Sequence, residues 1–324
     1  MKALRTTFAF AVALGAVSTG LTQTYPSRPV TVVIPSTAGG PGEILARILS
    51  ERMTISLGQP LIVETVPGAG GTIGVGRVAR AAPDGYTILL GNWNSNVANG
   101  AIYPVTYDLT KDFEPVALLT SAPLWIVSRK TFPANNLTEL IAWLRANPDK
   151  ASAATVGAGT AAHVCGLHFQ DKTGTRFQFV PYRGGGAAYQ DVVAGHIDLM
   201  CAETSATGRY VRVGAIKAFA VLARTRWSGA ADVPTTDELG LPGLYISFWQ
   251  SLWAPRGTPK NVVAKLNQAA VQALGDPTAN KRLIELGLEI PSSEQQTPEA
   301  LGIYHKAEIE KWWPIIKAAG IKVE

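Results

Sequence analysis

Short runs of β-branched residues lead directly into glycine-rich or amide-rich turns, and most of these turns open a helical pattern. The turns span 35–42, 67–74, 91–95, 157–160 and 181–186. The first N–H groups of a helix lack partners and carry partial positive charge, so they bind anions without Lys or Arg. Each glycine could instead only tighten a turn. Their number favours a cleft that holds a ligand with acidic groups.

The same turns do not favour an enzyme. The segment 157–162 fits G-x-G-x-x-A after a strand, but a dinucleotide site needs an acidic residue after the next strand, and Pro181-Tyr182-Arg183 stands there. The chain has no G-x-S-x-G motif. His163 and His168 are five residues apart and fall on different faces of a helix. We therefore expect no catalysis, no cofactor and no metal site.

Two cysteines, Cys165 and Cys201, fall in the second half of the chain. Two small buried side chains, one on a helix and one on a strand, are the interpretation we favour. A disulfide is the alternative, because the protein is expected in an oxidising compartment.

Alternating strand and helix patterns predict an α/β fold with mainly parallel sheets, whose strand ends carry the ligand. A chain of 324 residues exceeds one typical core. We expect lobe one at 25–123 plus 250–324 and lobe two at 124–249. A strand at 124–128 opens lobe two, 247–258 is a connection back to lobe one, and 262–274 and 298–316 are helices.

The first 23 residues resemble a signal peptide, with Lys2 and Arg5 before a short apolar run that is too short to span a bilayer. We expect cleavage near residues 18–24 and a periplasmic, soluble protein. Removal of both basic residues lowers the formal net charge from +5 to +3. No basic run alternates with aromatic residues, so nucleic acid and membrane insertion are not expected.

An ordered series of motifs then resembles one family along essentially the whole mature chain. They are Tyr25-Pro-Ser-Arg-Pro29, Pro67-Gly-Ala-Gly-Gly71, Ala82-Pro-Asp-Gly-Tyr-Thr87, Asp112-Phe113, Gly157-Ala-Gly-Thr160 with His163, Val180-Pro-Tyr-Arg-Gly184, Asp191 and Ala254-Pro-Arg-Gly-Thr-Pro259. They are similar to the Bug-type, TctC-like substrate-binding proteins of tripartite tricarboxylate transporters. The resemblance implies a type II-like, two-lobed periplasmic binding fold with hinge strands, which closes on small carboxylates and delivers them to a membrane permease.

The resemblance also implies the binding residues. From lobe one, the backbone around an Ala-Gly-Gly turn holds one ligand carboxylate, and Glu43 replaces the usual Asp three positions after that turn. From lobe two, a glycine turn and a second helix start form the other half, with His163 either a structural tie or a ligand contact. These residues are Ser36, Thr37, Ala38, Gly39 and Gly40 in lobe one, and Gly157, Ala158, Gly159, Thr160, His163, Arg183 and Gly184 in lobe two.

Departures from the family pattern suggest the kind of ligand. The segment 91–95 brings Trp93 between Asn92 and Asn94, and Phe248 lies near the return to lobe one. Flat faces of this kind suit an aromatic dicarboxylate such as a phthalate isomer, terephthalate among them. The alternative is that these aromatic rings are core residues. Glu203 follows a strand end, where it would repel a ligand carboxylate unless the ligand also carried a hydroxyl or an amine.

We therefore expect a monomeric transport receptor for a small carboxylate, favouring a dicarboxylate, with permease subunits as its protein partners. A periplasmic sensor subunit that presents its ligand to a signalling kinase is the alternative function.

Overall fold

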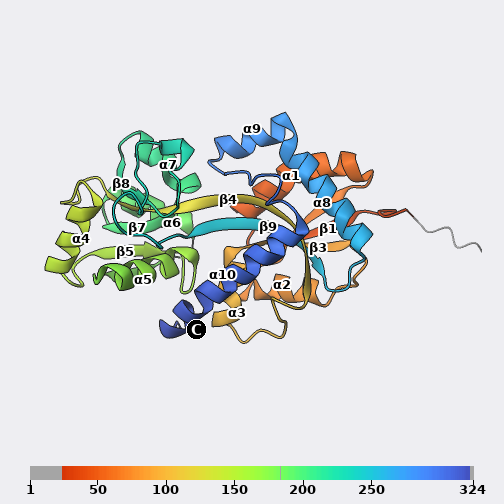
Figure 1. Cartoon of the computed structure of the whole chain (residues 1–324), viewed down its shortest axis with the longest axis horizontal. Helices are drawn as coiled ribbons and strands as arrows, with labels where there is room; N and C mark the ends of the chain where they lie inside the picture. Colours follow the sequence, from red (N-terminus) through yellow and green to blue (C-terminus); the bar gives the residue numbers. More distant parts are fainter. Residues whose placement is uncertain (1–23, 183, 322–324) are drawn as a thin grey trace, which may run out of the picture.

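The computed structural model describes residues 24–182 and 184–321. The predicted signal peptide and Arg183 lie outside the described residues. Figure 1 shows two lobes joined by two long strands, with the C-terminal helix packed across them.

Lobe one contains a parallel set of strands with helices on both faces. Its elements are β1 (Val30–Ile34), α1 (Pro41–Leu57), β2 (Leu61–Thr65), η1 (Ala69–Gly71), α2 (Thr72–Ala79), β3 (Thr87–Asn92), η2 (Asn94–Ala98), α3 (Asn99–Ile102), α8 (Lys260–Gly275), α9 (Pro277–Glu285) and α10 (Pro298–Ala318).

Lobe two repeats the plan with its own strands and helices. Its elements are α4 (Leu137–Ala146), β5 (Ser152–Thr155), α5 (Ala161–Thr173), β6 (Gln178–Pro181), α6 (Gly185–Ala194), β7 (Leu199–Glu203), α7 (Thr204–Arg212), β8 (Ile216–Val221) and η3 (Ser228–Ala230). The strands β4 (Phe113–Arg129) and β9 (Ser247–Pro255) connect the lobes.

One sheet of nine strands runs through both lobes in the order β2-β1-β3-β9-β4-β7-β5-β6, with β8 also paired to β4. The pairs β1–β2, β1–β3, β5–β6 and β5–β7 are parallel, whereas β4 and β9 pair antiparallel with their neighbours. The predicted two-lobed α/β fold with hinge strands is confirmed.

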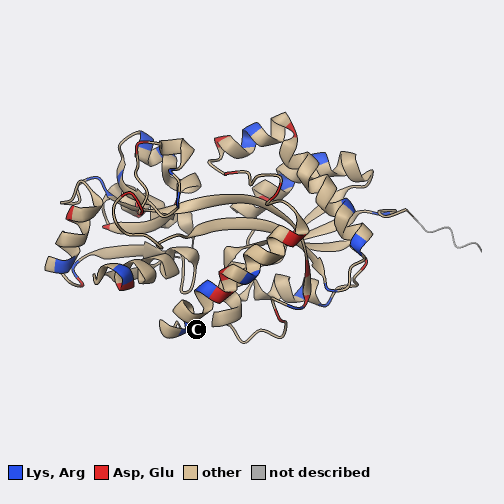
Figure 2. Ribbon diagram, viewed as in Figure 1, with Lys and Arg blue, Asp and Glu red and all other residues tan. Residues whose placement is uncertain are grey.

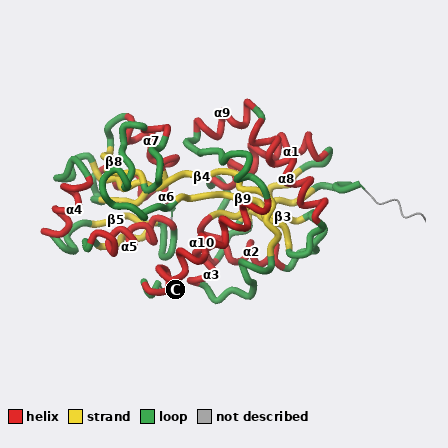
Figure 3. The backbone as a smooth tube through the Cα atoms, in the orientation of Figure 1, coloured by secondary structure: helices red, strands yellow, loops and turns green. Residues whose placement is uncertain are grey.

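The long strand β4 changes partners where the lobes meet. It pairs with β9 through Pro123, and with β7 from Leu124 onward. Figure 3 shows β4 and β9 as continuous strands through the middle of the molecule. Within the described residues these strands therefore link the two lobes directly, as part of the one sheet. The lobe boundaries given above stay a prediction.

One local expectation was wrong: the strand expected at 124–128 begins eleven residues earlier, at Phe113. The segment 247–258 connects the lobes as expected, and it does so through the strand β9. Most of β9 is buried on both faces, so its tryptophans and its polar Gln250 and Ser251 pack inside the protein. A strand buried on both faces lacks the polar and apolar alternation that marks a strand in sequence.

The hydrophobic core forms on both faces of the sheet. In β1, Val32 and Ile34 pack with α1 and α8, whereas Val33 belongs to a second cluster that continues into lobe two. The helix α10 extends this second cluster, because Trp312 packs edge-on against Trp93 of lobe one and His168 of lobe two. Lys311 also donates a hydrogen bond to the carbonyl of Tyr245. One helix thus contacts both lobes.

Cys165 of α5 and Cys201 of β7 form a disulfide, with their Cα atoms 6.1 Å apart. This corrects the favoured interpretation of two separate buried thiols. Both residues are buried as expected, but α5 packs directly on the sheet and places them opposite each other. The sequence distance of 36 residues carried no signal for this contact.

Charged side chains of both signs are interspersed along the helices and loops of the two lobes, and most of β4 and β9 carries none (Figure 2). Among the helices in the described part of the chain, none combines the length and apolar character needed to cross a bilayer.

Candidate functional site

A pocket lies where strands of lobe two end beside the first turn of α5. The space inside it is about 20 Å³, which is room for little more than one water molecule, and it opens to solvent. Lobe one contributes Asn94, β9 contributes Phe248, and the other lining residues belong to lobe two or to the lobe-two half of β4. They are Leu124, Val156, Ala161, Ala162, Tyr189, Met200, Cys201 and Glu203. The pocket is therefore mostly apolar, with an amide, a phenol and a carboxyl group among its walls.

The start of α5 faces this pocket. The backbone N–H of Ala161 donates a hydrogen bond to Oδ1 of Asn94, 3.0 Å away across the lobes. Thr160 does not cap the helix with its side chain, since its hydroxyl donates to the carbonyl of Gly157 at 2.9 Å. A free N–H at a helix start is a site for an anionic oxygen. Here an uncharged amide oxygen takes that position.

His163 holds the turn before α5 in place. Its Nδ1 accepts a hydrogen bond from the N–H of Gly159 at 3.0 Å, and its ring packs edge-on against Phe179. Burial lowers the pKa of His163, so the ring is neutral near pH 7 with its proton on Nε2. Of the two roles expected for His163, the structure shows the structural tie.

The two lobes touch at Gly159. This residue has φ of +73°, and a Cβ on it would overlap Cδ1 of Ile102 in lobe one and lie 3.7 Å from Ile321. Only glycine fits both the backbone conformation and this close approach. The glycine turn at 157–160 is thus part of the contact between the lobes, and it lies in sequence between Val156 and Ala161, which line the pocket.

Glu203 ends β7 and precedes α7, with its backbone opposite Leu124 of β4. Its carboxyl lines the pocket, and no described residue gives it a hydrogen-bond partner. Burial raises the pKa of Glu203 to about 7. The ionised and protonated forms therefore both exist at neutral pH.

Tyr189 of α6 lines the same pocket and was not singled out from sequence. Its hydroxyl lies against Gly185, where a Cβ would fall 2.8 Å from it. Burial and the nearby Glu203 raise the pKa of Tyr189, so it stays protonated. The signal in sequence was weak, because a tyrosine one turn into a helix is equally typical of core packing.

The first glycine turn is not among the residues that line the pocket. Its residues Ser36, Thr37, Ala38, Gly39 and Gly40 lead into α1, and Thr37 to Gly39 are exposed. Glu43 accepts a hydrogen bond from the N–H of Gly39 at 2.7 Å and pairs with Arg47. These two partners lower the pKa of Glu43. The acid thus stabilises its own turn, and a ligand role for the turn stays a prediction.

The structure corrects the prediction for Trp93. Its ring is fully buried, and its Nε1 donates to Glu308 of α10 at 3.0 Å; Trp249 donates to the same carboxyl oxygen at 3.3 Å. Asn92 and Ser95 form a turn with reciprocal hydrogen bonds. The segment 91–95 therefore brings only Asn94 to the pocket.

Phe248 keeps its expected place at the pocket, half-buried on the opposite face of β9 from Trp249. Gly184 is exposed before α6 and, like Ala158, does not line the pocket. Arg183 lies outside the described residues. The expected set is thus divided: Asn94, Glu203 and Phe248 line the pocket beside α5, and the other described residues of the set, from both lobes, do not.

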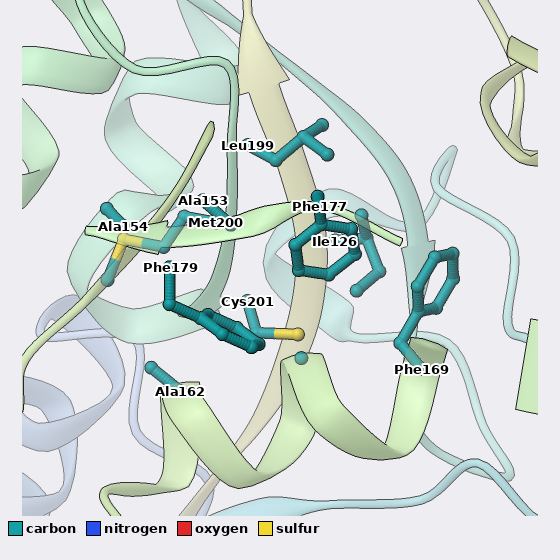
Figure 4. A pocket seen from close by; sticks show the side chains of 11 residues that line it. Ile126, Ala153, Ala154, Ala162, Phe169, Phe177, Phe179, Leu199, Met200 and Cys201 are labelled. Carbon is teal, nitrogen blue, oxygen red and sulfur yellow. The ribbon is translucent and has the colours of Figure 1, made fainter. Parts of the chain in front are cut away.

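A second, apolar pocket lies behind the first and shares Ala162, Met200 and Cys201 with it. Figure 4 shows the rings of Phe177 and Phe179 over the helix that carries Ala162 and Phe169. Cys201, which is disulfide-bonded to Cys165, lines both pockets. The wall of the candidate site is therefore tied covalently to α5.

No group of three or more His, Cys, Asp or Glu side chains suited to a metal occurs in 24–182 and 184–321. The polar groups that line the pocket can donate to or accept from a ligand oxygen or nitrogen, and its apolar side chains can contact a short carbon skeleton at the opening. The arrangement suits binding.

Comparison with known proteins gives consistent matches. Residues 45–321 match the model of the tripartite tricarboxylate transporter family receptor. MatC of Rhodopseudomonas palustris, solved with bound malate, is 38% identical, with a TM-score of 0.80 over 90% of this chain and 100% of that one. The periplasmic binding protein BugD is 39% identical, with a TM-score of 0.79 over 93% and 100%. A further R. palustris protein, solved with adipate, is 30% identical, with a TM-score of 0.81 over 92% and 99%.

Proposed function

Because this chain belongs to the tripartite tricarboxylate transporter receptor family, we propose that it captures a small carboxylate between its lobes and delivers it to the permease of such a transporter. The resemblance to Bug-type proteins is confirmed by the match to BugD. The family and these neighbours are solute-binding proteins and not enzymes.

The observation that carries the proposal is the hydrogen bond from Ala161 at the start of α5 to Asn94 across the lobes. It supports a site where an oxygen from the ligand can take an N–H donor at a helix start while both lobes surround it. A hydrogen bond to a charged oxygen contributes about 1.5–3 kcal/mol, more than one to a neutral amide. A carboxylate is therefore the better partner for this donor.

The proposed ligand is a dicarboxylate of a few carbon atoms. Two of the similar structures hold malate and adipate, which are aliphatic dicarboxylates. The pocket of this chain is lined by short apolar side chains and one phenyl ring, Phe248. The proposal of an aromatic dicarboxylate such as a phthalate isomer, terephthalate among them, now rests on stacking against Phe248 alone, because Trp93 is buried in the core.

Export is part of the proposal. We infer that the segment 1–23 is a signal peptide removed near residues 18–24 and that the mature protein acts in the periplasm as a monomer. The disulfide fits that compartment, because disulfides form and persist there.

A thermal-shift screen of the purified mature protein tests the proposal. A ligand at one hundred times its Kd stabilises a protein by about 2.7 kcal/mol, so we expect a melting-temperature rise of roughly 5 °C or more for at least one dicarboxylate. Matched diols and diamides serve as controls, because they keep the carbon skeleton and lose the charge. If no mono-, di- or tricarboxylate raises the melting temperature, carboxylate capture is ruled out.

A further inference from the structure

We propose that Glu203 and Tyr189 make the pocket selective for carboxylates that carry a hydroxyl or an amine close to the carboxylate. This inference rests on the proposed function and narrows its ligand class to hydroxy- and amino-carboxylates.

The position of Glu203 is fixed by the sheet. It is the last residue of β7, its backbone is paired with Leu124, and Phe248 and Met200 line the pocket with it. Glu203 is half-buried among these neighbours, so its carboxyl group has only limited contact with water, and limiting that contact without a hydrogen-bond partner is costly. A ligand that presents an O–H or N–H group at this point offsets that cost.

Tyr189, on the helix α6, supports the same preference for a ligand with a hydroxyl or an amine. Its side chain lines the pocket from α6, and Glu203 is close enough to raise its pKa. A phenol can accept from a ligand N–H or O–H group and donate to a ligand oxygen. Among the described residues that line the pocket, Tyr189 and Glu203 are the titratable side chains; Asn94, from lobe one, is uncharged.

A rival arrangement uses the same acid differently. A second ligand carboxylate could share one proton with Glu203, as two close carboxyl groups do. The two arrangements differ in the sign of their pH dependence, because burial places the pKa of Glu203 at about 7. A ligand ammonium needs ionised Glu203, so its affinity rises as the pH increases through 7. A proton shared between Glu203 and a ligand carboxylate is lost over the same pH range. The affinity for such a ligand therefore falls as the pH increases through 7.

Calorimetric titration of the wild-type protein with succinate, malate and aspartate tests the proposal. These probes have the same four-carbon skeleton and carry no donor, a hydroxyl or an ammonium. We expect malate to bind about tenfold more tightly than succinate, and aspartate roughly 10- to 100-fold more tightly. Titrations about one pH unit below and above 7 then give the sign of the pH dependence.

Two substitutions assign the preference to this residue. Glu203→Leu should bring malate and aspartate to within about threefold of succinate, whereas Glu203→Gln should keep the preference for malate and lose the pH dependence of aspartate binding. Glu289→Gln is the matched control. That acid also has a pKa raised by burial, but it pairs with Ser121 through its backbone and does not line the pocket. Melting temperatures of all variants show whether they fold.

The outcomes are distinct. If succinate binds as tightly as malate and aspartate, or binds best and weakens as the pH rises, the donor preference is overturned while carboxylate capture stands. If the preference survives Glu203→Leu in a folded protein, Glu203 is not its source. If no carboxylate binds the wild-type protein, the proposed function and this inference fall together.

Discussion

The glycine-rich turns of the two lobes look alike in sequence and do different work in the structure. In lobe one, Gly71 packs against the carbonyl of Pro35, where a Cβ would lie only 2.6 Å away, and Asn99 donates to the carbonyl of Gly70. In lobe two, the turn before α5 touches the opposite lobe at Gly159, and the residues on either side of the turn, Val156 and Ala161, line the pocket. The glycines of lobe one let neighbouring turns of the same lobe pack against each other. Gly159 of lobe two lets its turn pack against the other lobe.

The lobes also differ in that a disulfide cross-links lobe two. Breaking this disulfide should have the largest effect on stability. The Cys165–Cys201 disulfide ties α5 to β7 in lobe two. Closing a loop of 36 residues contributes about 3–4 kcal/mol in the chain-entropy description. We expect reductant to lower the free energy of unfolding by an amount of this order, measured by urea titration.

The double variant Cys165→Ala with Cys201→Ala is the control for this experiment. It should show the lowered stability without reductant and no further change with it. An identical urea midpoint for oxidised and reduced wild-type protein would contradict the assigned support of lobe two.

Alanine at matched glycines separates packing from binding. Gly71→Ala combines a φ of +98° with a contact to backbone, so we expect a loss of roughly 2–4 kcal/mol in stability and no specific loss of affinity. Gly159→Ala should cost about 1–2 kcal/mol in stability, but it should weaken ligand binding about tenfold because its methyl group meets Ile102 as the lobes close. Urea titration and calorimetry measure the two effects.

Gly174→Ala is the control for both. Its φ is +62° and nothing lies within 4 Å of its Cβ position, so it should show the conformational cost alone. Should Gly159→Ala bind ligand as tightly as Gly174→Ala, the contact between the lobes at this residue does not contribute to binding.

The smallest effects should separate the two aromatic residues that the sequence suggested together. Trp93→Phe removes one donor from Glu308, so we expect a stability loss of about 1–2 kcal/mol and unchanged ligand selectivity. Phe248→Leu should weaken aromatic carboxylates by about 2- to 10-fold relative to aliphatic ones. A selective loss of aromatic ligands in Trp93→Phe would restore the stacking role to Trp93.

Local sequence patterns were sufficient for most of lobe two. β-Branched runs and the turns after them predicted the strands β5, β6 and β7 and the helices that follow, because each of these units is decided by neighbouring residues. Asn94, Glu203 and Phe248 were placed at the cleft for the same reason, since each lies at or near a strand end. Their binding roles stay predictions.

Contacts between distant segments were not accessible in this way. Trp93 is buried because Glu308, 215 residues later, supplies an acceptor for its indole. The disulfide depends on how α5 lies on the sheet, and the length of β4 depends on β9 as its partner. Sequence periodicity describes one element at a time, so it does not show which residues such pairings bury.

Because the N–H of Ala161 already donates to Asn94, ligand capture as proposed is an exchange of one acceptor for another. In the proposed binding mode, a carboxylate that takes the Ala161 N–H displaces the Asn94 oxygen, so the net gain is the difference between a charged and a neutral acceptor, about 1 kcal/mol, and not the whole bond. The same side chain can reclaim the donor when the ligand leaves. For a receptor that must release its ligand, an internal competitor such as Asn94 is useful. It shortens the residence time of the ligand without changing the preference for one ligand over another.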